Sequence, residues 1–388
     1  MLFLILVRVS EVKLPPFKIL ALQSIIENVN ISQAEGIFMR LIIHAGMNKT
    51  GSSSIQDTVS ELSRPDLTYV DWKSANHSEM YVLLFQDPKM QARYHIFKTQ
   101  GWSAADLSAE RKVWLKRLRH QMKQNTAPLT VFSGEDISQP GFSEEGVKRM
   151  RDFFASYFED IRVIAYARPP LSFMNSSFQQ QVKSGGLDNI NIDRLWPSYR
   201  KRFEKLDRVF GRENVDLVPF SRETLHGEDV VSDFFWRAGL EQPETLPPSK
   251  NDGLSLEALA LLFAQRKLGE GLRTGFREAT KANNAFVFAL SSVWREKFSF
   301  SKTLLDGVVE RHQSDMDWIE DRIGQPLRDA PKASGRQISC EQDLIDVATE
   351  QAQVVQLLEL IQKKGRRGRG DPERRLTYLL DCLNRLSG

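Results

Sequence analysis

Cysteine is nearly absent from this chain, which has two among its 388 residues. Cys340 and Cys382 are too few for a disulfide framework or a zinc site, and without a secretory signal pattern they predict a reducing, cytoplasmic location. No run of about 20 apolar residues, the length that a membrane span requires, occurs in the sequence. The apolar start at residues 1–7 is followed at once by Arg8. These absences predict a protein without structural disulfides or a transmembrane segment.

Charge of one sign is also scarce, since 53 Lys and Arg against 50 Asp and Glu give a net charge of +3. This net positive charge is too small to indicate nucleic-acid binding. The basic run at residues 363–369 has no interleaved aromatics to stack on bases, and we interpret it as a solvated linker. Contact with an anionic glycan or membrane surface is the alternative. With 41% hydrophobic residues, the composition predicts one enzyme-sized globular body.

What the chain does have is a distinctive loop between an apolar run and an amphipathic helix. Residues 41–56 read LIIHAGMNKTGSSSIQ. The apolar run predicts a buried strand, and from Ile55 onwards apolar residues recur at the spacing of a helix face. Gly46 and Gly51 let successive amide groups converge, the helix N-terminus adds partial positive charge, and Lys49 adds a full one. The segment therefore predicts a site for a phosphate or sulfate ester.

The order of residues differs from the Walker A loop, because Lys49 precedes the second glycine of the pattern, Gly51. The pattern G-x-x-K-[TS]-G-[TS]-[TS] resembles the 5′-phosphosulfate loop of sulfotransferases that use 3′-phosphoadenosine 5′-phosphosulfate. A Ser-rich turn before an ordinary surface helix is the alternative interpretation. The resemblance extends over roughly residues 40–240. It implies that the donor is bound by Lys49, Thr50, Gly51, Ser52 and Ser53.

A second motif follows another apolar run, at residues 161–167. Arg168 stands at the end of this predicted strand, and Ser176 follows eight residues later within a helical pattern. The sulfotransferase family binds the 3′-phosphate with an Arg and a Ser at this spacing, so the resemblance implies that role here. Arg suits a fixed phosphate because its planar donors bind two oxygens. Pro169 departs from the family, which usually has Asp, Asn or Glu there, and a surface Arg with a solvated Ser is the alternative.

Further apolar runs alternate with helical patterns and predict an α/β fold with a P-loop-like parallel sheet flanked by helices. These runs lie at residues 67–72, 129–132 and 215–220. Amphipathic patterns at 254–268 and 308–323 predict a mostly helical C-terminal part. We expect an N-terminal extension outside the fold over residues 1–38, an α/β core over 39–250, and a helical region over 251–388.

Sulfuryl transfer requires stabilisation of the charge that develops on the leaving oxygen, and the resemblance places Lys49 for that role. It also requires a base for the proton of the acceptor. His77 and Glu135 are the candidates, because each follows a predicted strand at the edge where ligands bind in α/β sheets. Branches of the family use either residue type. We favour His77 slightly, since a histidine at such an edge is rarer than an acidic residue, and a helix or loop cap is the alternative role for both.

These features predict a sulfotransferase that moves a sulfuryl group from 3′-phosphoadenosine 5′-phosphosulfate to an acceptor hydroxyl without a metal. The alternatives are another phosphate-loop enzyme such as a kinase, which would depend on Mg²⁺ and ATP, and a non-catalytic nucleotide-binding partner. A carbohydrate or glycolipid acceptor is weakly favoured, because tryptophan faces stack on sugar rings. The tryptophans near the expected acceptor loops are Trp72, Trp102, Trp114 and Trp196.

Overall fold

The structure is a computed structural model. It describes residues 39–184, 189–243, 253–269, 283–284, 287–288, 290, 294, 296–329, 335–352 and 354–355. The expected extension over residues 1–38, the basic run at 363–369 and Cys382 lie outside the described residues.

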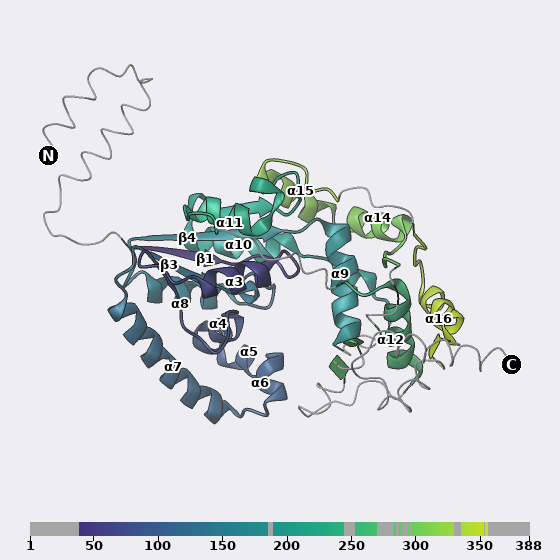
Figure 1. Ribbon diagram of the computed structural model, residues 1–388, viewed down its shortest axis with the longest axis horizontal. Coiled ribbons are helices and arrows are strands. Elements are labelled where there is room, and N and C mark those ends of the chain that lie inside the picture. Colours follow the sequence, from purple (N-terminus) through teal and green to yellow (C-terminus); the bar gives the residue numbers. More distant parts are fainter. Residues whose placement is uncertain are drawn as a thin grey trace, which may run out of the picture. The chain divides into compact units, whose positions relative to one another are not determined.

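Five strands form one parallel sheet in the order β2-β3-β1-β4-β5, as Figure 1 shows. The central strand, β1, pairs with β3 on one side and with β4 on the other. Because the strands are parallel, the segments that follow β1, β3 and β4 leave the sheet from the same edge, where α/β proteins bind ligands. The predicted parallel sheet is confirmed. The strand bounds are β1 Arg40–His44, β2 Leu67–Tyr69, β3 Leu129–Ser133, β4 Asp160–Ala167 and β5 Val215–Pro219.

Helices cover both faces of the sheet, which is why its strands read as nearly continuous apolar runs. Along β1, Leu41 and Ile43 join one apolar cluster and Ile42 joins the other, as alternating side chains must. The Ile42 face is covered by α3 (Ser52–Glu61) and α11 (Val230–Ala238). The opposite face is covered by α4 (Ser78–Phe85), α7 (Ala104–Gln124), α8 (Glu144–Phe154) and α10 (Tyr199–Phe210).

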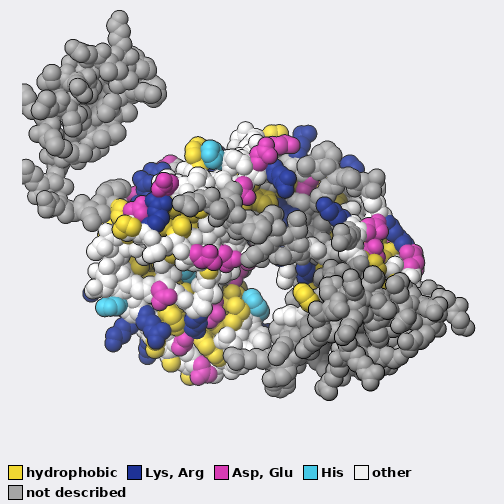
Figure 2. All heavy atoms as spheres, in the orientation of Figure 1, with side chains coloured by type: hydrophobic (Ala, Val, Ile, Leu, Met, Phe, Trp, Pro, Cys, Tyr) yellow, Lys and Arg dark blue, Asp and Glu magenta, His cyan; other side chains and the backbone are white. Residues whose placement is uncertain are grey.

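The long helix α7 illustrates how the sequence specifies one of these covering helices. A capping box starts it, in which the Ser103 hydroxyl accepts a hydrogen bond from the Asp106 amide at 3.2 Å. The exposed side chains of its second half are mainly basic, and Figure 2 shows Lys and Arg side chains gathered over the helix. The buried side chains lie at helical spacing and pack toward the sheet: Leu107, Trp114, Leu118 and Met122.

The helix after β4, α9 (Pro170–Lys183), links the sheet to the C-terminal helices. It packs against α12 (Leu256–Leu268), as Figure 1 shows. The Phe178 ring of α9 lies 5.0 Å from the ring of Phe300. The described residues beyond 250 are mostly helical, as predicted, and join the same apolar cluster as one sheet face. These later helices are α14 (Lys302–Arg311), α15 (Gln313–Ile323) and α16 (Glu341–Glu350). The short elements are α5 Pro88–Gln91, α6 His95–Thr99, η1 Glu135–Ser138, η2 Ile192–Leu195, η3 Arg212–Asn214 and η4 His226–Glu228.

Candidate functional site

The loop between β1 and α3 is bound tightly to the neighbouring strand. The Ala45 and Met47 amides donate to the carbonyl oxygens of β4, at 2.9 and 3.0 Å. Lys49 adopts a left-handed conformation with φ 64°, which is uncommon for a residue with a side chain. Gly51 is also left-handed, and a Cβ there would lie 2.4 Å from a methyl group of Val230. The loop therefore has a fixed shape that requires glycine where it meets α3.

The start of α3 offers unused hydrogen-bond donors. Gly51 is the N-cap residue, so no side chain caps the amides of the first turn. The Ser52 hydroxyl is buried and has no hydrogen-bond partner among the described residues, whereas Ser53 is exposed. The Thr50 hydroxyl instead donates to the Met47 carbonyl at 2.6 Å and so stabilises the loop itself. An uncapped helix start with an orphaned buried hydroxyl fits an anionic ligand.

Arg168, which follows β4, lies against this loop. Its Nη1 donates to the Lys49 carbonyl at 2.9 Å, and its Nε donates to the Ser172 hydroxyl at 3.2 Å. Burial lowers the pKa of Arg168, which nevertheless stays charged because a guanidinium titrates far above neutral pH. Ser176 is partly buried further along α9, and its hydroxyl makes none of the hydrogen bonds seen among the described residues. The structure thus brings Arg168 to the loop and leaves Ser176 available on the helix that follows.

A carboxylate from the C-terminal region reaches the same place. Asp329 accepts hydrogen bonds from the Leu171 and Ser172 amides, at 2.9 and 2.8 Å, in the first turn of α9. The negative charge of Asp329 raises the pKa of Arg168 and so counteracts part of the lowering caused by burial. The position beside Arg168 therefore already binds an anionic group of the protein's own.

Glu135 begins η1, which is separated from β3 by the single residue Gly134, and lies at the same edge of the sheet as the loop. The preceding Gly134 has no room for a side chain, because a Cβ would lie 2.6 Å from the Tyr81 ring. Burial, followed by the charge of Asp136, raises the pKa of Glu135 to about 7, although Lys49 and Arg202 act in the opposite direction. A carboxyl group with a pKa near 7 is suited to accept a proton at neutral pH.

Two buried cations on α10 complete the site, and sequence reasoning missed both. Arg202 and Lys205 are each 5% exposed. The Lys205 ammonium donates to the carbonyl oxygens of Gln139 and Phe142, at 2.5 and 2.7 Å, and its burial lowers its pKa to about 7. A signal was present in the sequence for Arg202, which lies on the apolar stripe of α10 with Tyr199 and Leu206, whereas Lys205 lies at the edge of that stripe.

No protein-family model matches the chain, and no curated protein matches its sequence. Solved structures similar to it include a sulfotransferase from Alicyclobacillus acidocaldarius, with 12% identity and a TM-score of 0.35 over 74% of this chain and 96% of that one. The sulfotransferase domain from the curacin biosynthetic pathway has 13% identity and a TM-score of 0.34 over 72% of this chain and 99% of that one. Values this low assign no activity, so the functional argument depends on the residues of the site.

His77 lies at the amino end of α4 with both ring nitrogens engaged. Its Nε2 lies 2.8 Å from the Val70 carbonyl, and its Nδ1 accepts a hydrogen bond from the Ser133 amide at 2.9 Å. Burial lowers the pKa of His77 to about 4, so the ring is neutral at pH 7. A neutral imidazole with no free lone pair is not available as a base, so the geometry favours Glu135 over His77.

The tryptophans expected to contact a sugar are mainly core residues. Trp72, Trp114 and Trp196 are buried, and the first two rings lie 4.0 Å apart. Trp102 is partly buried and stacks on Phe97. Their burial removes most of the reason for favouring a carbohydrate or glycolipid acceptor.

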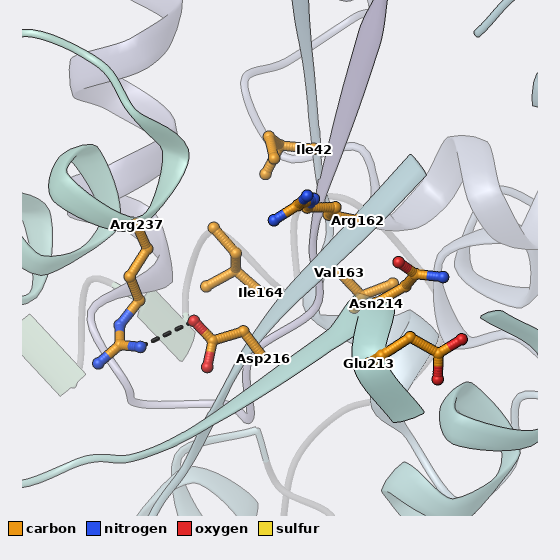
Figure 3. Close-up of a pocket in the computed structure, with 8 residues that line it drawn as sticks. All are labelled: Ile42, Arg162, Val163, Ile164, Glu213, Asn214, Asp216 and Arg237. Carbon is orange, nitrogen blue, oxygen red and sulfur yellow. Dashed lines mark hydrogen bonds and ion pairs between the residues drawn. The ribbon is translucent and has the colours of Figure 1, made fainter. Parts of the chain in front are cut away.

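A pocket of about 230 Å³ lies elsewhere, near the start of β5 (Figure 3). Arg237 crosses its wall and pairs with Asp216 at 2.7 Å. The pocket opens where β5 begins, at the end of the sheet opposite the loop, and both guanidinium groups that line it are paired, Arg237 with Asp216 and Arg162 with Asp160. It has none of the site's free donors, so we do not consider it the candidate site. Within the described ranges, no helix is long and apolar enough to cross a membrane, and no group of three metal-ligating side chains occurs.

Proposed function

We propose that this protein transfers a sulfuryl group from 3′-phosphoadenosine 5′-phosphosulfate to an acceptor hydroxyl. One observation carries the proposal: the uncapped start of α3, with Lys49 beside it, meets Arg168 and a carboxyl group of raised pKa at one edge of the sheet. The loop sequence, with Lys49 before Gly51, supports a phosphosulfate rather than a Walker-type nucleoside triphosphate.

The residues have distinct roles in this proposal. The first-turn amides of α3 and the orphaned Ser52 hydroxyl bind the 5′-phosphosulfate, with Lys49 and Ser53 at its exposed side. Arg168 and Ser176 bind the 3′-phosphate. Lys49 stabilises the charge that appears on the leaving phosphate oxygen as the bond to sulfur breaks. No metal has a part in these steps.

Glu135 serves as the base. The acceptor hydroxyl attacks sulfur in line with the leaving oxygen, and its proton passes to the Glu135 carboxylate. The raised pKa makes Glu135 a stronger base than an exposed glutamate, while Lys49 and Arg202 keep part of it ionised at pH 7. We propose only that the acceptor carries a hydroxyl group, because buried tryptophans cannot stack on a sugar ring.

The test is incubation with donor labelled in its sulfuryl group, together with fractionated glycans, lipids and phenols, followed by isolation of labelled product. We expect transfer to at least one fraction and no requirement for Mg²⁺ or ATP. Turnover that depends on Mg²⁺ and ATP would instead support a phosphate-loop kinase. Nucleotide binding without product across every fraction would support a non-catalytic partner.

A further inference from the structure

A chain of three polar side chains runs from α10 to the phosphosulfate loop. The Nη1 of Arg202 donates to Oε1 of Gln139 at 3.1 Å. The Nε2 of Gln139 then donates to Oδ1 of Asn48, the residue before Lys49. A second contact joins the same two segments, because the Ser138 hydroxyl lies 3.2 Å from the Gly46 carbonyl. The segment that begins with Glu135 therefore also holds the loop that carries Lys49.

The first member of the chain fixes the orientation of the other two. A guanidinium group can only donate, so Gln139 must present its carbonyl oxygen to Arg202 and its NH₂ group to Asn48. Asn48 must then accept through Oδ1, which turns its own NH₂ group away from Gln139. None of the hydrogen bonds within the described part of the chain uses that NH₂ group, and Asn48 is only partly buried. Its two donors are free for a ligand.

The beginning of this chain is rigidly held. Arg202 also donates from Nε to the Pro197 carbonyl at 2.6 Å, and its guanidinium lies 5.3 Å from the centre of the Phe173 ring. Lys205 holds the Gln139 backbone, as described above. Neither cation forms an ion pair among the described residues, although burying a charge is costly. Because two buried cations both donate hydrogen bonds to Gln139, we infer that the position of Gln139 matters to the site.

We propose that Asn48 donates from Nδ2 to the sulfuryl oxygens of the donor, and that Gln139 and Arg202 are positioning residues that aim it. This inference rests on the proposed function. The α3 amides and Ser52 come after Lys49 in the chain, and in this proposal they bind the phosphate. Asn48 lies on the other side of Lys49, toward the segment that carries Glu135, where sulfur must sit between the leaving oxygen and the base.

The test compares the affinities of 3′-phosphoadenosine 5′-phosphosulfate and adenosine 3′,5′-bisphosphate by calorimetry, so it requires no acceptor. Asn48→Ala removes the donor. Gln139→Glu keeps the contact with Arg202 but offers Asn48 only an acceptor, which forces the Asn48 amide to reverse. We expect each variant to lower the affinity for 3′-phosphoadenosine 5′-phosphosulfate about 10- to 100-fold, the usual effect of losing a hydrogen bond to a charged group. Affinity for the bisphosphate, which lacks the sulfuryl group, should stay within about twofold of wild type.

The double variant separates orientation from charge. If Gln139→Glu acts through Asn48, adding it to Asn48→Ala has no further effect. If the fold-losses in phosphosulfate affinity of the two single variants multiply in the double variant, the added carboxylate acts by its charge and the inference is wrong. The inference is also wrong if neither single variant changes the ratio of phosphosulfate to bisphosphate affinity. Retained bisphosphate binding shows that a variant is folded, and Asn48→Leu, which keeps the size of the side chain without its hydrogen-bonding groups or any charge, replaces Asn48→Ala if that variant does not fold. Wild-type protein that binds neither nucleotide would overturn the proposed function itself.

Discussion

The two ends of the sheet use charged side chains in opposite ways. At the end where β5 begins, Arg237 pairs with Asp216 and Asp233 at 2.7 and 2.6 Å, so all three side chains have an oppositely charged partner within the chain. At the other end, Lys49 and Glu135 form no ion pair among the described residues, and burial raises the pKa of Glu135 to about 7. A paired charge already has its partner within the protein, whereas charges left unpaired near a helix start are available to a ligand.

The largest effects should come from substitutions at Lys49 and Glu135. Lys49→Ala removes a cation that forms no ion pair among the described residues. Loss of charge stabilisation on the leaving oxygen should lower turnover by about 10²- to 10³-fold. The donor should also bind about tenfold less tightly, because Lys49 contacts the phosphosulfate before reaction as well. Steady-state kinetics together with calorimetry measures both. Normal turnover in this variant would show that the carboxyl end of the sheet is not the reaction site.

Glu135→Gln should lower turnover by about 10²- to 10⁴-fold and leave adenosine 3′,5′-bisphosphate affinity nearly unchanged, since a base acts only in the chemical step. The wild-type rate should rise with pH through an apparent pKa of about 7, because the active form is the deprotonated carboxylate and lower pH protonates it. A pH–rate profile measures this limb, which the Glu135→Gln variant should lack.

His77→Ala is the matched comparison for that prediction. Both ring nitrogens of His77 bond to the backbone, so its removal should reduce thermal stability while the pH–rate limb near 7 stays. Loss of the limb in His77→Ala, with Glu135→Gln still active, would make His77 the base and exclude Glu135.

At the opposite end of the sheet, Arg237→Ala should destabilise the protein by about 3 kcal/mol, because Asp233 is fully buried and would lose its paired cation. Asp233 would keep only the Tyr166 hydroxyl and the His226 amide, at 2.9 and 2.8 Å. Denaturant unfolding measures the change, and nucleotide affinity in the folded variant should equal that of wild type. Weaker nucleotide binding would mean that the two ends are not independent.

The sequence predicted well those features that depend on neighbouring residues of the chain, and it missed those that depend on contacts made by folding. The strands were recognisable because both sheet faces are buried, and the loop was recognisable because Gly51 and Lys49 are local features of the chain. The state of His77 was not, since its partners Val70 and Ser133 come from two other segments brought together only by folding. The contact of Asp329 with α9, across more than 150 residues, has no local signature either.

Arg168→Ala tests the part of the site that would read the 3′-phosphate. Affinity for adenosine 3′,5′-bisphosphate should fall about 10- to 100-fold, the effect of losing a charge-assisted contact, while adenosine 5′-monophosphate affinity changes little. Wild type should correspondingly prefer the bisphosphate. Titration calorimetry with both nucleotides decides this, and equal wild-type affinities would remove the 3′-phosphate role from Arg168 and Ser176.

The smallest effect concerns Asp329, whose carboxylate lies at the start of α9 beside Arg168. Asp329→Asn keeps an acceptor for one of the two α9 amides, turns an NH₂ group toward the other, and removes a negative charge that would repel a 3′-phosphate beside Arg168. A charge at a helix start is worth about 0.3–1 kcal/mol, so bisphosphate affinity should rise about two- to fivefold. The gain should shrink at high salt, because screening weakens the repulsion, and adenosine 5′-monophosphate should show none of it. If Asp329→Asn weakens the bisphosphate instead, the carboxylate serves to order the start of α9 for the ligand, and its charge belongs with the paired, structural charges of the opposite end.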